Sequence, residues 1–327
     1  MEQVKTDLHA FVIRREEMLK IDFIYEVTDR IRNKMVGTCE VLIKRITHNN
    51  GQQLTGILFK KHGKESPLIY LDKYYDQYVD GRMSMVEIVD EIMRIQGEGG
   101  VQELIDIGGL ADYEAVQSKI RLKLVNYEAN KARLEGMPHV PFLDLAIMFY
   151  VEIDSNSQRI LTAAVEHHHL EMWGIGKERI YNDALYNMRA CCPVRIKSVM
   201  SVIKEVEEEN DGNLDLIISE EDISHEQGFW IMTTKLGIQG ASTLVHGDGL
   251  KKFAQINRDN IVILPSSIHE VMLIPQMLAN GNYEYLSHMV EEVNRDEVLR
   301  EDRLSNSIYL YNRNEDSITI AYRGPEL

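Results

Sequence analysis

Cysteine is scarce in this chain of 327 residues, which contains only Cys39, Cys191 and Cys192. An odd number with one adjacent pair does not make a disulfide framework, and no Cys-x-x-Cys spacing for zinc occurs. A chain of this length buries about three quarters of its unfolded surface, so it needs neither a disulfide nor a metal to be stable. The cysteines therefore indicate a reducing compartment, and we expect a cytoplasmic protein.

Basic side chains are also fewer than acidic ones. The sequence has 36 Lys and Arg against 52 Asp and Glu, a formal net charge of −16. Binding of nucleic acid without sequence preference needs a large basic surface, so we expect no nucleic-acid partner. Ten of the acidic residues lie between Glu205 and Glu226, where no Lys or Arg occurs. This stretch is typical of a solvated connection, and its spacing lacks the closing glutamate of a calcium loop.

Long apolar runs are missing as well. The longest lies around Leu143 to Val151 and is far shorter than the roughly 20 residues that cross a bilayer. Residues Met1 to Asp7 lack the basic flank and apolar core of a signal peptide. We therefore expect no membrane association and no export signal.

The residues that are present predict a folded α+β protein. At 44 % hydrophobic and 27 % charged, the composition is that of a globular chain, and the length suggests about two domains. We place the boundary between residues 136 and 137, next to Pro138 and Pro141. The first region, 1–136, contains a hairpin near 49–51, and the second is 137–327. The predicted architecture is mixed, mainly antiparallel sheets with packed helices.

Local patterns predict individual elements. Residues 24–35 have helical periodicity, and Asn49-Asn50-Gly51 is a strong turn signal between two strands. Ser84 and Glu87 form a capping-box pattern before a helix. Further strands are expected at 121–125, 143–153, 229–233, 241–245 and 261–264, and a terminal hairpin at 307–322.

One candidate catalytic group follows the strand 261–264. Ser267, His269 and Glu270 supply a hydroxyl, an imidazole and a carboxylate within four residues. Alternation along an extended chain would put Ser267 and His269 on one face, as a nucleophile and its base require. No Gly-x-Ser-x-Gly elbow exposes the serine, so capping of the strand end is the competing interpretation.

One candidate metal group involves the run His167-His168-His169. If this run is extended, His167 and His169 point to one face, and His246 is a distant residue that could complete a transition-metal site. No His-Glu-x-x-His pattern supports this, and a polar strand end is the competing interpretation. The pair Cys191-Cys192 is expected at a helix C-terminus, where the helix dipole disfavours a thiolate, so we predict structural thiols.

Motifs in both halves of the sequence resemble those of one protein family. In the first half they lie between Val41 and Ile95 and include Asn49-Asn50-Gly51, Leu54, Gly56, Ile69-Tyr70-Leu71 and Tyr74-Tyr75. In the second half they are Phe142-Leu143-Asp144-Leu145-Ala146, Trp173-Gly174-Ile175, the run from Ile263 to Val271 and Leu304-Ser305-Asn306-Ser307-Ile308-Tyr309. The chain resembles an uncharacterised family from Gram-positive gut bacteria. The resemblance implies one co-folding unit and no established activity, cofactor or catalytic residue.

The sequence therefore favours a non-catalytic accessory or interaction module that binds a protein or a small molecule. The alternative is a metal-assisted or serine-type hydrolase using His167, His169, Ser267 and His269. No motif identifies a cofactor.

Overall fold

The computed structural model describes residues 20–61, 64–66, 68–99, 111–155, 160–202 and 228–327. These residues form two compact units. The first contains the described residues up to His48 and those from Gln53 to residue 99. The second contains Asn49–Gln52 and the described residues from Ala111 onward. The acidic stretch from Glu205 to Glu226 lies outside the described residues.

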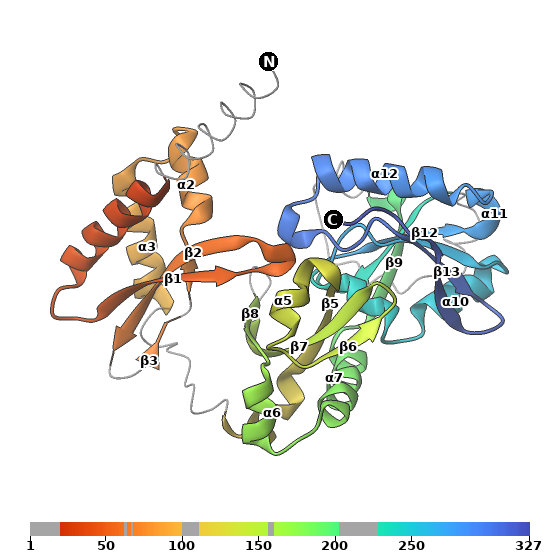
Figure 1. The fold of residues 1–327 in the computed structure, drawn as a ribbon, viewed down its shortest axis with the longest axis horizontal. Coiled ribbons are helices and arrows are strands. Elements are labelled where there is room, and N and C mark those ends of the chain that lie inside the picture. Colours follow the sequence, from red (N-terminus) through yellow and green to blue (C-terminus); the bar gives the residue numbers. More distant parts are fainter. Residues whose placement is uncertain (1–19, 62–63, 67, 100–110, 156–159, 203–227) are drawn as a thin grey trace. The chain divides into compact units, whose positions relative to one another are not determined.

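The first unit is a sheet with helices (Figure 1). Its elements are a helix at residues 20–35, β1 (Glu40–Thr47), β2 (Gln53–Lys61), β3 (Lys64–Glu65), β4 (Ile69–Tyr70), α2 (Asp72–Val79) and α3 (Met85–Gly99). Alternate residues of β1 and β2 point to one face, where Val41 pairs with Phe59 and Ile43 with Ile57. The buried side chains of helix 20–35, α2 and α3 pack on this face. The predicted capping box is present, because Ser84 N–H donates to Glu87 Oε2 at 2.8 Å.

The second unit contains two sheets. The first sheet has β5 (Ile120–Asn126), β6 (His139–Phe142), β7 (Leu145–Ser155) and β8 (Ile160–Ala164). The second sheet has the order β14-β13-β11-β12-β10-β9 and contains β9 (Val194–Ser198), β10 (Trp230–Thr234), β11 (Ile261–Leu264), β12 (Val271–Pro275), β13 (Ile308–Asn312) and β14 (Ser317–Tyr322). Every pairing between the described strands is antiparallel. The predicted α+β class is confirmed.

Helices and short turns of helix complete the second unit. They include η1 (Asn49–Gly51), α4 (Tyr113–Val116), η3 (Gln117–Lys119), η4 (Glu128–Asn130), α5 (Lys131–Leu134), α6 (His167–Trp173), α7 (Lys177–Cys191), η5 (Gly240–Leu244), α10 (Gly249–Asn257), α11 (Gln276–Ala279), α12 (Tyr283–Asp296) and η6 (Arg300–Asp302). Leu286 and Val290 of α12 pack on Val262, Ile274 and Ile308 of the six-stranded sheet. The domain boundary predicted at residues 136 and 137 lies inside this unit, between α5 and β6.

Two local predictions were wrong. Residues 241–245 are not a strand, because η5 occupies Gly240–Leu244 and all five of its residues are buried. The histidine run is not extended, because His167 begins the helix α6. In both places the side chains allow either conformation, and the surrounding packing decides between them.

Asp144 is central to a buried hydrogen-bond cluster in the second unit. Its Oδ2 accepts from the hydroxyls of Ser305 and Ser307, both at 2.8 Å, and its Oδ1 accepts from Tyr309 at 2.5 Å. The three donor residues are at most 2 % exposed. Asp144 lies in the turn before β7 of the four-stranded sheet, whereas Tyr309 lies on β13 of the six-stranded sheet. The Asp144 cluster therefore joins the two sheets.

The turn that carries Asp144 is strained. Phe142 pairs with Leu145, so Leu143 and Asp144 form a two-residue connection between β6 and β7. Leu143 has a φ of 58°, in the left-handed region that costs a branched side chain about 1–2 kcal/mol. Hairpins of this type usually have glycine there. The strained turn places the Asp144 carboxylate within hydrogen-bond distance of three buried hydroxyls, and these bonds offset the strain.

We predict that substitutions at these two adjacent positions affect stability differently. Asp144→Ala leaves three buried hydroxyls without their acceptor, so the free energy of unfolding should fall by about 4 kcal/mol. Leu143→Gly relieves the backbone strain and should leave this energy unchanged or raise it by about 1 kcal/mol. Urea denaturation measures both, with Asp296→Ala as an exposed control. A loss below about 1 kcal/mol for Asp144→Ala would show that the cluster does not hold the sheets together.

Candidate functional site

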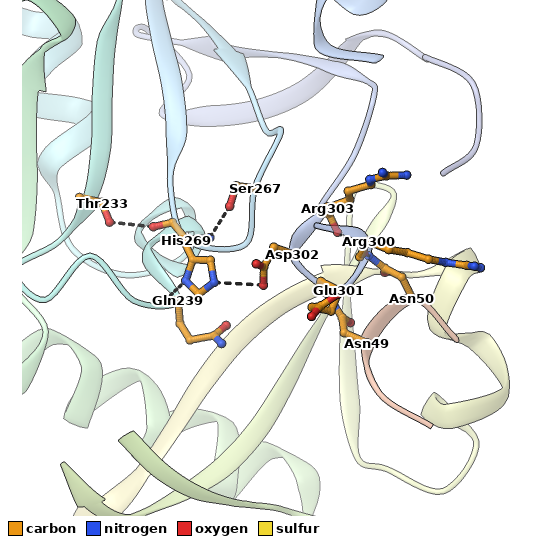
Figure 2. Close-up of polar contacts among 10 residues, drawn as sticks. All are labelled: Asn49, Asn50, Thr233, Gln239, Ser267, His269, Arg300, Glu301, Asp302 and Arg303. Atoms are coloured by element: carbon orange, nitrogen blue, oxygen red, sulfur yellow. Dashed lines mark hydrogen bonds and ion pairs between the residues drawn. The ribbon is translucent and has the colours of Figure 1, made fainter. Parts of the chain in front are cut away.

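The loop between β11 and β12 carries the predicted catalytic group. Backbone hydrogen bonds hold it on two sides. Ala241 N–H donates to the carbonyl of Ile268 at 3.1 Å, and Ile268 N–H donates to the carbonyl of Asp302 at 2.8 Å. Figure 2 shows His269 projecting from this loop between Gln239 and Asp302.

Both ring nitrogens of His269 have hydrogen-bond partners. Nδ1 accepts from the backbone N–H of Gln239 at 3.3 Å, and Nε2 lies 3.1 Å from Asp302 Oδ1. An accepting Nδ1 requires that Nε2 carries the proton and donates it to the carboxylate. The carbonyl of His269 also accepts from Thr233 Oγ1 at 2.7 Å. In this tautomer the imidazole has no lone pair left to remove a proton from a nucleophile.

Ser267 and Glu270 do not pair with the imidazole. Ser267 Oγ accepts from the backbone N–H of His269 at 3.0 Å, as in a local turn. The side chain of Glu270 is exposed, and the carboxylate beside His269 belongs to Asp302. Asp302 is 33 residues further along the chain, so no local motif predicts it. The arrangement is a histidine–aspartate pair without a serine in hydrogen-bond contact with the ring.

Close packing shapes the loop around His269. A side chain at Gly240 would collide with Thr233 Oγ1 and with the carbonyl of His269. The preceding Gln239 has a left-handed φ of 53° and presents its N–H to the ring. Only glycine allows this approach, so the imidazole is fixed in place.

The turn Asn49–Gly51 holds the segment that carries Asp302. Asn50 Nδ2 donates to the carbonyls of Arg300 and Arg303, each at 2.7 Å, and Asn49 Nδ2 donates to that of Glu301 at 2.6 Å (Figure 2). Asn50 adopts a φ of 55°, which asparagine tolerates better than most residues. Side-chain amides therefore immobilise the partner of His269.

The predicted metal ligands do not come together. His167 is exposed, and His169 Nδ1 accepts from the N–H of Glu166 at 2.9 Å as part of a helix cap. Burial, and then the charge of His168, lowers the pKa of His169. His246 is 1 % exposed, and its Nε2 lies 3.3 Å from Ser242 Oγ. Among the described residues, no three His, Cys, Asp or Glu side chains are grouped to hold a metal ion.

Of the cysteine pair, Cys192 has the environment expected of a structural thiol. Cys191 ends α7, as predicted, and is exposed. Burial raises the pKa of Cys192, which opposes thiolate formation despite the charge of Arg121.

A groove lies in the first unit, between helix 20–35 and the β1–β2 face. Its volume is about 400 Å³, and we refer to it as the first-unit groove. It is lined by Ile21, Ile24, Tyr25, Ile43, Arg45 and Thr55. The sequence did not indicate it, because the lining comes from three elements and each segment has an ordinary amphipathic pattern.

Lys123 is a second group that the sequence did not single out. It lies on β5 opposite Met148, among apolar neighbours. Burial, and then the charge of Arg133, lowers its pKa to about 8. A lysine in the middle of an apolar strand was the available signal.

A match to a family model shows which protein family the chain belongs to. The model of a family of unknown function, DUF5688, matches residues 21–313. The chain belongs to this family. No curated protein and no solved structure matches it. The DUF5688 match covers the Asp144 cluster, the His269 loop and the first-unit groove. No helix in the described part of the chain has the length and apolar character to cross a membrane.

His246 predicts a pH dependence of stability. Burial, followed by the charge of Arg189, lowers its pKa to about 4, against about 6.5 in an unfolded chain. Between these values the unfolded state binds a proton that the folded state does not bind, so stability falls as the pH drops from about 6.5 to 4. The contribution of this group is about 3 kcal/mol.

Urea denaturation at about pH 7 and pH 4.5 measures this loss. His246→Gln should lose less stability over this range than the unsubstituted chain, whereas the exposed control His288→Gln on α12 should lose as much. An NMR titration that placed the folded His246 pKa near 6.5 would contradict the prediction.

Proposed function

We propose that this DUF5688 member is a cytoplasmic, non-catalytic binding protein whose ligand site is the first-unit groove. The observation that carries the proposal is the groove itself, an open volume of about 400 Å³ beside a packed core. This is within the range of about 300–1,000 Å³ that is usual for small-molecule sites. We propose a small-molecule partner and no nucleic-acid partner.

The base of the groove is fixed and its rim is accessible. Ile24 is 5 % exposed and belongs to the core of the unit, and Ile43 packs against that core. Tyr25 is 57 % exposed and Ile21 37 % exposed, on the same helix. A fixed apolar base with an exposed aromatic rim supports binding of an apolar group, since ordering such a ligand requires little rearrangement of the protein.

Thr55 and Asp72, beside the groove, have partners. Thr55 N–H donates to Asp72 Oδ2 at 2.8 Å, and Asp72 Oδ1 forms an ion pair with Lys20 Nζ at 2.7 Å. The ammonium of Lys20 also lies 5.7 Å from the centre of the Tyr75 ring. The carboxylate is thus engaged by an amide and an ammonium, which supports a binding role over acid–base chemistry.

The hydrogen bonds of His269 also favour binding over catalysis. The imidazole lies between a backbone donor and Asp302, and the Ser267 hydroxyl is engaged by a backbone N–H. A hydrolase built on these residues would first have to break the contacts that fix the loop. Within the residues that the structure describes, the histidine–aspartate pair is the feature that supports the hydrolase alternative.

Binding in the groove is tested with octan-1-ol, a neutral probe with an aliphatic chain. We expect saturable binding, monitored by NMR shifts of groove residues, because the probe covers the isoleucines. Tyr25→Ser and Ile21→Ser should each weaken it about fivefold, whereas the exposed control Tyr186→Ser on α7 should not change it. Equal weakening by all three variants would place the probe elsewhere.

The hydrolase alternative makes a separate prediction. If Ser267 and His269 only stabilise the loop, Ser267→Ala and His269→Asn should leave the hydrolysis of p-nitrophenyl acetate at its unsubstituted level. His269→Asn should also lower the free energy of unfolding by about 2 kcal/mol, because Asp302 and Gln239 lose their partner. A hundredfold loss of esterase rate in both variants, with folding retained, would establish the alternative.

A further inference from the structure

Arg45 is the charged side chain that lines the first-unit groove. It lies on β1 directly opposite Thr55 of β2 and is exposed. Within the described part of the chain, its guanidinium forms no hydrogen bond and no ion pair. An arginine in this setting can take a planar anion in a two-pronged contact.

The nearby acidic group does not neutralise Arg45. Asp72 is the carboxylate next to Thr55, and Lys20 and the Thr55 amide already engage it. The lining itself contains no carboxylate, since the other members are isoleucines, a tyrosine and a threonine. The groove therefore combines an apolar base with one uncompensated positive charge.

Strand alternation places this charge on the same side as the apolar residues. Ile43 and Arg45 are two residues apart on β1, so they share the face toward helix 20–35. Lys44, between them, points to the opposite face and is also exposed. Arg45 therefore lies at the groove, and its neighbour Lys44 is a matched cation outside it.

We infer that the first-unit groove binds a small amphipathic carboxylate. The apolar body of the ligand covers Ile21, Ile24 and Ile43, and its carboxylate pairs with the guanidinium of Arg45. This inference rests on the proposed function, since it names the class of ligand for the same groove. The volume of about 400 Å³ is near the small end of ligand sites, which suits a short aliphatic or single-ring acid.

The inference is tested with octanoate, octan-1-ol and octylammonium, which share a chain length and differ in the head group. Isothermal titration calorimetry at constant ionic strength should show that octanoate binds about tenfold more tightly than octan-1-ol, because a charge-assisted hydrogen bond is added. Octylammonium should bind most weakly.

Arg45→Gln should remove the preference, so that octanoate and octan-1-ol bind equally. Lys44→Gln should keep the tenfold ratio, and Arg45→Lys should restore part of it, because lysine keeps the charge and loses the planar fork. Circular dichroism melting curves check that each variant is folded, and Arg45→Lys keeps the test available if Arg45→Gln does not fold.

The possible failures are distinguishable. Equal binding of octanoate and octan-1-ol by the unsubstituted chain, or an equal loss in Lys44→Gln, overturns the carboxylate inference while the groove remains a binding site. If neither probe binds, both the inference and the proposed function are overturned.

Discussion

The second unit depends on one carboxylate. Asp144 accepts from three hydroxyls on residues that are at most 2 % exposed, two from the segment before β13 and one from β13 itself. Buried polar groups are costly unless every one is satisfied, so the cluster specifies how the four-stranded and six-stranded sheets meet. Asn126 adds to it, since its Nδ2 donates to the carbonyl of Leu304 at 3.0 Å. The strained backbone at Leu143 is offset by these bonds.

Other polar side chains of the second unit also form hydrogen bonds that hold its loops in place. The residues after β11 carry a serine and a histidine, and both engage backbone or carboxylate groups of their own unit. Asn50 and Asn49 satisfy the carbonyls of the segment that carries Asp302. Side chains with catalytic potential are thus used to close loops. The first-unit groove differs, because Arg45 faces it without a partner in the described part of the chain.

The sequence predicts this fold well wherever the signal is local. The capping box at Ser84, the turn at Asn49-Asn50-Gly51 and the terminal hairpin follow from propensity and alternation, and all three are present. Residues 241–245 were misassigned because their mixture of small, β-branched and apolar residues fits a strand as well as the buried turn of 3₁₀-helix that they form. The pairing of His269 with Asp302 and the first-unit groove were not predictable, because each joins segments far apart in sequence. Such contacts depend on tertiary packing, which one sequence does not reveal.

Asn50 is followed by Gly51, and this dipeptide is chemically labile. In a free chain the glycine nitrogen attacks the asparagine side-chain amide, releases ammonia and leaves a succinimide that opens to aspartate or isoaspartate. Here the amide donates to two carbonyls and accepts from Asn130, so it is held away from that attack. Deamidation at this bond therefore has to wait until the turn opens. An aspartate carboxylate formed there has no hydrogen to donate to the carbonyl oxygens of Arg300 and Arg303. Deamidation during a single opening of the turn would therefore remove these two hydrogen bonds permanently.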